Sequence, residues 1–245
     1  MRHRIARLLA SIGEADCPLR PTELFNEGWM LRLLLDELRC ESRPNHPFTF
    51  FEGAKWFSES LLPSPFLPRF RSDPLGEGWT NADGVVGHCK LSQSGRGDLA
   101  LVKDARQLVV IEAKMSSGLS KGVKRCAVYD QASRTVACIA EVLARASAKP
   151  DGFQRLAFFV VAPSVQISAG IFGDRLSKAT IECTVRNRVE AYVGARDEWF
   201  NGWFQPTLAA SVIQLLSWEQ ALEGLPDELH QFYARCIEFN RPAKS

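Results

Sequence analysis

The sequence predicts an α/β protein in which strands and helices alternate along one chain. Two strand candidates at 98–103 and 108–115 are rich in Leu, Val and Ile and stand close together. An uninterrupted apolar run at 153–162 suits a strand that is buried on both faces. Between these strands, residues 123–148 repeat apolar side chains at the spacing of a helix. Strands separated by a helix of this length are typical of the α/β class.

The segment before these strands predicts two helices, an irregular loop and a further strand. Apolar residues spaced by three and four follow Thr22, a candidate N-cap, and a shorter helix is expected at 54–62. Prolines and glycines then exclude regular structure, so we expect either a surface loop over a binding face or a linker. A strand is expected at 82–90.

The remainder of the chain is expected to be mainly helical, beginning with a helix at 179–195. The predicted order is therefore α-β-β-β-α-β-α. We interpret residues 1–245 as a single elaborated domain, with a core at 22–162 and a mainly helical C-terminal extension at 163–245.

The composition indicates a folded, globular protein but does not by itself indicate a function. The chain has 245 residues, of which 46% are hydrophobic and 24% charged, and this is enough for one large core. The formal net charge of +2 does not by itself indicate a polyanion partner. The seven cysteines form no C-x-x-C pair, and no apolar run is long enough to span a bilayer, so we expect reduced thiols in a cytoplasmic protein without a membrane partner.

Three residues on the strand candidates suggest chemistry. Asp98 begins one strand, and Glu112 and Lys114 end the next, where alternation of side chains puts the last two on one face. If a hairpin turn is centred on Ala105, Asp98 pairs with Glu112, and two carboxylates so placed can bridge a divalent cation. A shift of one residue would turn Asp98 to the other face, so this pairing is a sharp prediction.

Carboxylate oxygens are the ligands that Mg²⁺ prefers, and Mn²⁺ is expected to substitute for it. Asp98 and Glu112 are therefore the predicted metal ligands, and the backbone carbonyl of Ala113 could add a third oxygen. Lys114 beside the metal can orient water and stabilise charge on a phosphate. Hydrolysis of a phosphodiester is the reaction that these groups favour.

These residues resemble the motif of the PD-(D/E)XK nuclease superfamily over roughly 22–162, although Gly97 stands where the motif has proline. The resemblance implies a restriction-endonuclease-like fold, with a central four-stranded mixed sheet flanked by helices. It also implies a glutamate on the first helix at the metal site, which Glu27 resembles. Gln131 and Tyr129 are similar to catalytic residues of exonuclease-like members, although their spacing differs from the usual pattern.

Basic residues cluster from Lys114 to Lys149, a stretch that contains seven of them, Lys114 included, and only two acidic residues. Such residues bind phosphates without reading sequence. The predicted nucleic-acid contacts, with DNA as the expected partner, are Lys121, Lys124, Arg125 and Arg134.

Other interpretations stay open. Glu27 could reach water at the edge of its helix, Gln131 and Tyr129 could serve packing, and Asp83 is a rival metal ligand that we interpret as a turn residue. The alternative function is a catalytically silent module that binds nucleic acid or protein on the same fold. A third hypothesis is a subunit that forms a homodimer or docks a partner protein through its C-terminal part.

Overall fold

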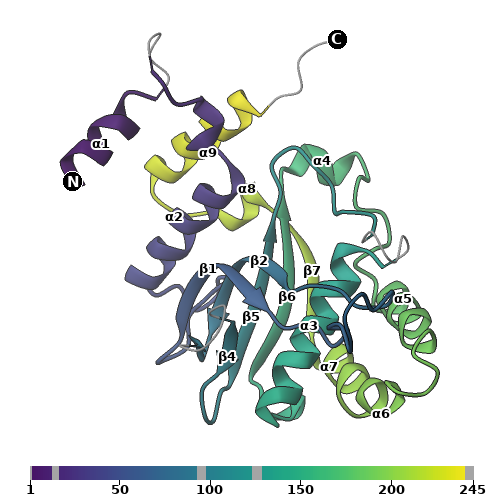
Figure 1. Ribbon diagram of the computed structural model, residues 1–245. Helices are drawn as coiled ribbons and strands as arrows, with labels where there is room; N and C mark the ends of the chain where they lie inside the picture. Colours follow the sequence, from purple (N-terminus) through teal and green to yellow (C-terminus); the bar gives the residue numbers. More distant parts are fainter. Residues whose placement is uncertain (1, 13–16, 93–97, 123–128, 241–245) are drawn as a thin grey trace.

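The computed structural model of the protein describes residues 2–12, 17–92, 98–122 and 129–240. It contains a sheet with helices on both sides (Figure 1). The strands are β1 (Lys55–Leu62), β2 (Thr80–Gly87), β3 (Cys89–Leu91), β4 (Leu99–Leu101), β5 (Gln107–Ala113), β6 (Arg155–Ala162) and β7 (Val212–Ser217). The α-helices are α1 (Arg2–Ala10), α2 (Glu27–Cys40), α3 (Gln131–Ala146), α4 (Ser164–Ser168), α5 (Lys178–Glu190), α6 (Asp197–Trp199), α7 (Gln205–Ala210), α8 (Trp218–Ala221) and α9 (Asp227–Phe239). Short 3₁₀ turns lie at η1 (Pro21–Glu23) and η2 (Pro150–Gly152), and a π-helical turn, η3, at Phe200–Phe204.

The sheet has five strands in the order β1-β2-β5-β6-β7. The pairs β1–β2 and β2–β5 are antiparallel, whereas the pairs β5–β6 and β6–β7 are parallel. All seven residues of β5 are buried, as expected for a strand covered on both faces. The α/β class and the mixed sheet are therefore confirmed.

Helices cover both faces of this sheet and divide the core into two layers. Helices α2, α8 and α9 pack on one face, where Met30, Leu34 and Trp218 are fully buried. Helices α3, α5 and α7 cover the other face, around Tyr129, Phe158 and Phe204 (Figure 1). Because β5 and β6 lie between these layers, their ends are held by packing from both sides.

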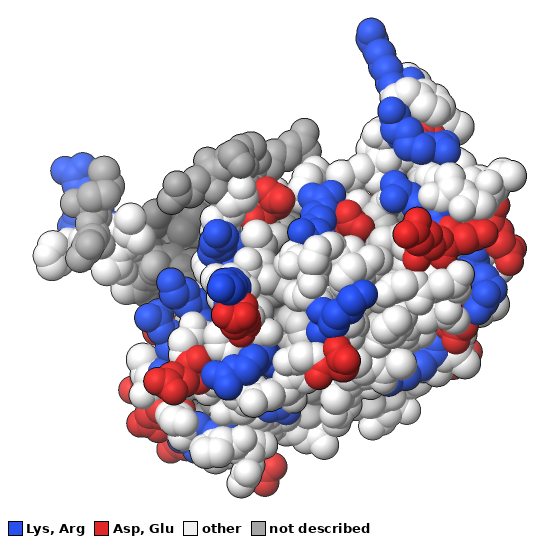
Figure 2. Space-filling model, turned by 90° about the horizontal axis from the view of Figure 1, so that it is seen from below, with Lys and Arg blue, Asp and Glu red and all other residues white. Residues whose placement is uncertain are grey.

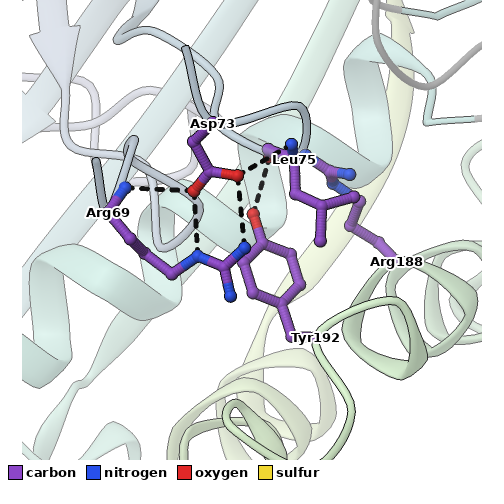
Figure 3. A network of polar contacts seen from close by, with 5 residues as sticks. All are labelled: Arg69, Asp73, Leu75, Arg188 and Tyr192. Atoms are coloured by element: carbon purple, nitrogen blue, oxygen red, sulfur yellow. Dashed lines mark hydrogen bonds and ion pairs between the residues drawn. The ribbon is translucent and has the colours of Figure 1, made fainter. Parts of the chain in front are cut away.

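The loop that joins β1 to β2 lies against α5. Arg188 and Tyr192 both donate hydrogen bonds to the carbonyl of Leu75 (Figure 3). Within the loop, Arg69 Nε lies 2.8 Å from Asp73 Oδ2, and its guanidinium lies over the Tyr192 ring at 4.7 Å. The absence of regular structure in this segment is confirmed, and its contacts make it a packed surface loop and not a free linker.

Three predictions about the elements are wrong. The segment predicted as a helix at 54–62 is the strand β1 (Lys55–Leu62), which pairs with β2 on both sides of Glu59. The sheet has five strands and not four, since β7 within the expected helical extension pairs with β6. The first main helix begins after Asn26, whose side chain accepts a hydrogen bond from the Trp29 amide, and not after Thr22.

Other predictions are confirmed with adjusted bounds. Strand β6 matches the predicted strand at 153–162, and α5 matches the predicted helix at 179–195. The described part of the helix predicted at 123–148 is α3, which begins after Asp130, whose side chain accepts a hydrogen bond from Ser133 N at 2.8 Å. No helix in the described residues is long and apolar enough to cross a membrane.

Candidate active site

Asp83 and Glu112 face each other across the two central antiparallel strands. The paired register of β2 and β5 ends at Gly84 with Ile111, and one step beyond it Asp83 comes opposite Glu112, whose charge acts on it. Asp83 Oδ2 accepts a hydrogen bond of 2.7 Å from the backbone N–H of Ala113. A Cβ on Gly84 would meet Leu31 of α2, so Gly84 faces α2, and alternation along β2 turns Asp83 toward α3.

The backbone of the edge strand is irregular beside this pair. Glu59 of β1 lies opposite Asp83 in the register and has a φ of 51°, a left-handed conformation that is uncommon outside glycine. The β1–β2 pairing skips this position, between Ser58–Gly84 and Ser60–Ala82. Local strain of this kind concentrates at functional sites.

Glu112 is buried and held by two donors. Lys114 Nζ and Gln131 Nε2 each lie 2.5 Å from Glu112 Oε1, and only 4% of the Glu112 side chain is exposed. Gln131 is the first residue of α3, and its own side-chain oxygen accepts from the Ser120 amide at 3.1 Å. The N-terminal end of α3 thus reaches the carboxylate, which is the end where a helix dipole favours negative charge.

The electrostatics of the pair suit a cation. Burial, and after it the negative charge of Glu112, raise the pKa of Asp83 to about 7, against the smaller opposing effects of the Ala113 N–H and Lys114. A divalent ion that prefers oxygen ligands would offset the repulsion between two carboxylates in such a partly buried site. Among the described residues no group of three or more His, Cys, Asp or Glu side chains is arranged to hold a metal.

The predicted pairing of Asp98 with Glu112 is wrong. Strand β4, which follows Asp98, pairs with β3 in a separate two-stranded sheet, whereas β5 pairs with β2 and β6. Asp98 instead forms an isolated bridge with Leu61, and its carboxylate lies 4.0 Å from Arg145. The physical reason is length: β4 has three residues, and the longer β2 supplies the ladder that completes the buried strand β5.

Asp83 is thus the residue that the sequence interpretation assigned wrongly, as a turn residue. It lies inside β2, next to the buried run Gly84–Gly87. A signal was present, because an aspartate within a strand candidate is unusual unless it has partners. The pairing that brings Asp83 to Glu112 spans the inserted β3–β4 hairpin, whereas the acid nearer in sequence, Asp98, lies in another sheet.

The other predicted site residues are placed as follows. Glu27 is the first residue of α2, and its charge adds to the effect of burial in raising the pKa of the Cys236 thiol on α9, so its role as a metal ligand stays a prediction. Tyr129 is fully buried against Phe66, at 5.7 Å between ring centroids, which indicates packing. The Ala113 N–H binds Asp83, while the role of its carbonyl stays a prediction.

Only part of the predicted basic cluster is described. Lys121 is exposed, and Arg134 is half-buried beside Glu77 and Tyr129, whose pKa values its charge lowers against the larger effect of burial. Lys124 and Arg125 lie outside the described residues. On the face seen from below, basic and acidic side chains are interspersed, so that view does not show a single basic surface (Figure 2).

Comparison of the chain with protein-family models, with curated proteins and with solved structures gave no significant match.

Proposed function

We propose that the protein is a metal-dependent nuclease with a restriction-endonuclease-like core, and that Asp83, Glu112 and Lys114 form its active site. The observation that carries the proposal is the facing pair of Asp83 and Glu112 on β2 and β5, with Lys114 bound to Glu112. The PD-(D/E)XK resemblance implies an acid and an acid-x-lysine on two adjacent strands, followed by a helix and a further strand. Asp83 takes the place that was predicted for Asp98.

Each side chain has a role in this proposal. Asp83 and Glu112 would hold Mg²⁺ or Mn²⁺, which supplies positive charge at the substrate phosphate and acidifies water there. Lys114 presents its ammonium beside Glu112, where it can stabilise charge that develops on the phosphate. Gln131 fixes the orientation of Glu112 from the end of α3.

DNA is the proposed substrate class. The basic residues that follow Lys114 would contact backbone phosphates without reading the bases, and Lys121, Arg145 and Lys149 are exposed among those that the structure describes. Such contacts give affinity that falls as salt concentration rises.

The first test is a cleavage assay with circular DNA, linear DNA and RNA in Mg²⁺, Mn²⁺ or EDTA. We expect metal-dependent cleavage of DNA that falls by roughly a hundredfold or more in Asp83→Asn, Glu112→Gln and Lys114→Met. Asp98→Asn is the matched control, because it removes an acid outside the Asp83–Glu112 pair, and it should cleave like the wild type. Loss of cleavage in Asp98→Asn with full activity in Asp83→Asn would refute the assignment.

One observation favours the alternative, a catalytically silent binding module. Glu112 Oε1 is already satisfied by Lys114 and Gln131 without a metal, as in a structural ion pair. A protein that binds DNA equally in Mg²⁺ and EDTA and never cleaves would support that alternative. A homodimer or partner protein docked on the C-terminal part stays a separate prediction, which sedimentation of the purified protein would test.

A further inference from the structure

The peptide that follows the catalytic strand is held by side chains from the C-terminal half of the chain. Strand β5 ends at Ala113, so Lys114 is the first residue beyond it. The Lys114 N–H donates to Val161 O of β6 at 2.8 Å. Its carbonyl accepts a hydrogen bond of 2.9 Å from the indole N–H of Trp218, and the next carbonyl, of Met115, accepts from Gln166 Nε2 at 3.0 Å.

We propose that Trp218, supported by Gln166, is a positioning residue that keeps the Lys114 ammonium on Glu112. This inference rests on the proposed function, and it assigns an active-site role to a segment that the sequence suggested only as a docking extension. Where a strand ends, ladder hydrogen bonds no longer fix the peptide plane. The indole and amide donors replace them, and they keep the side chain of Lys114 on the face of Glu112.

Trp218 is itself well fixed. It is the first residue of α8, which begins with a capping box formed by Ser217 and Gln220 at the end of β7. Since β6 lies between β7 and β5, the fully buried indole reaches past the end of β6 to meet Lys114.

The next residue along α8 anchors the same turn. Glu219 accepts hydrogen bonds from Tyr233 of α9, at 2.8 Å, and from the Ser164 amide, at 3.0 Å. These contacts hold α8 against α4 and α9 and so help to fix the position of Trp218 at its start.

The chain offers a matched control in Trp199. This tryptophan is also buried, between Phe66 and Phe204, but its indole N–H has no hydrogen-bond partner among the described residues. Trp218→Phe and Trp199→Phe therefore remove the same atoms from two core sites, and only the first removes a hydrogen bond to the catalytic segment.

The experiment measures kcat, KM for DNA, thermal stability and hydrogen exchange of residues 112–116 in the wild type, Trp218→Phe and Trp199→Phe. We expect Trp218→Phe to lower kcat by roughly tenfold to a hundredfold with little change in KM, and to speed exchange of that segment. Trp199→Phe should leave kcat and that exchange unchanged even where it lowers stability. Gln166→Leu, which removes the donor to Met115, should lower kcat in the same direction and serves if Trp218→Phe does not fold.

Unchanged kcat and exchange in Trp218→Phe, or equal losses in Trp199→Phe, would overturn the positioning role. A wild type that never cleaves would instead refute the proposed nuclease, and the exchange of residues 112–116 would still decide whether Trp218 orders that segment.

Discussion

Because two side chains donate to the Leu75 carbonyl, we expect the losses of unfolding free energy in Arg188→Met and Tyr192→Phe not to add up in the double variant. Arg188 Nη2 and Tyr192 Oη both donate to this oxygen, the second at 2.6 Å, so either residue alone can keep it satisfied (Figure 3). A hydrogen bond from a neutral hydroxyl contributes about 1 kcal/mol net, so Tyr192→Phe should lower the free energy of unfolding by about that amount. The Phe ring would keep the stacking on Phe66, whose centroid lies 5.3 Å away.

The substitution Arg188→Met should lower the free energy of unfolding by more than Tyr192→Phe does. The guanidinium is 3% exposed, lies 5.1 Å from the Phe66 centroid, and faces the buried Glu77. Loss of a charged hydrogen bond and of a desolvated cation–π contact should together cost about 3 kcal/mol. In the double variant the Leu75 carbonyl loses both donors, and because Leu75 is half-buried we expect a further loss of about 1 kcal/mol beyond the sum.

Urea unfolding of the two single variants and the double variant measures this coupling. Arg186→Met is the control on the same helix, because Arg186 is exposed and its pair with Glu182 should contribute less than about 1 kcal/mol. Additive losses for Arg188→Met and Tyr192→Phe would refute the argument that the two donors share one acceptor.

Two further predictions concern the core. A Cβ on Gly87 would lie 2.3 Å from the backbone oxygen of Gln107, so Gly87→Ala should lower the free energy of unfolding by about 3 kcal/mol. Gly78→Ala is the control, because a Cβ there would meet no atom within 4 Å, and it should change that free energy little. Urea unfolding of both variants measures the difference. Burial lowers the pKa of His46, so the folded state binds its proton less readily than the unfolded chain, and the stability from neutral His46 should be lost as pH falls through about 6.5. Unfolding at about pH 7.5 and about pH 5.5 should therefore differ more for the wild type than for His46→Gln, and equal differences would contradict this origin.

The class of fold could be predicted because strong local patterns decide it. The apolar run of β6 and the spacing of α3 and α5 each lie within one element and need no knowledge of partners. Strand β7 was not predicted because it is short and its first four residues are exposed or half-buried, so it lacks a long apolar run. The segments on either side of it are helical, which favoured a helical interpretation of the whole region. Strand β1 was interpreted as a helix because its aromatic and serine residues fit both periods over so short a span.

The candidate site was half predictable for a related reason. Glu112 and Lys114 were identified from a short motif and Gln131 from the family resemblance, and the structure brings these three together. The second acid required the strand order, because Asp98 is nearer to Glu112 in sequence but only Asp83 is its neighbour across the ladder. Strand pairing is set by total burial and not by the shortest connection, so a single sequence leaves the choice open.

The predicted division of the chain at residue 163 separates groups that are in direct contact. Parallel pairing joins Ala162 of β6 to Ser217 of β7, so the sheet itself crosses the expected boundary. The indole of Trp218 and the amide of Gln166 then hold the two carbonyls that follow Glu112. The end of the strand that carries the proposed catalytic lysine thus takes two of its hydrogen-bond donors from the C-terminal half of the chain. The predicted extension is therefore part of the structure that would orient the site, whatever partner its outer surface binds.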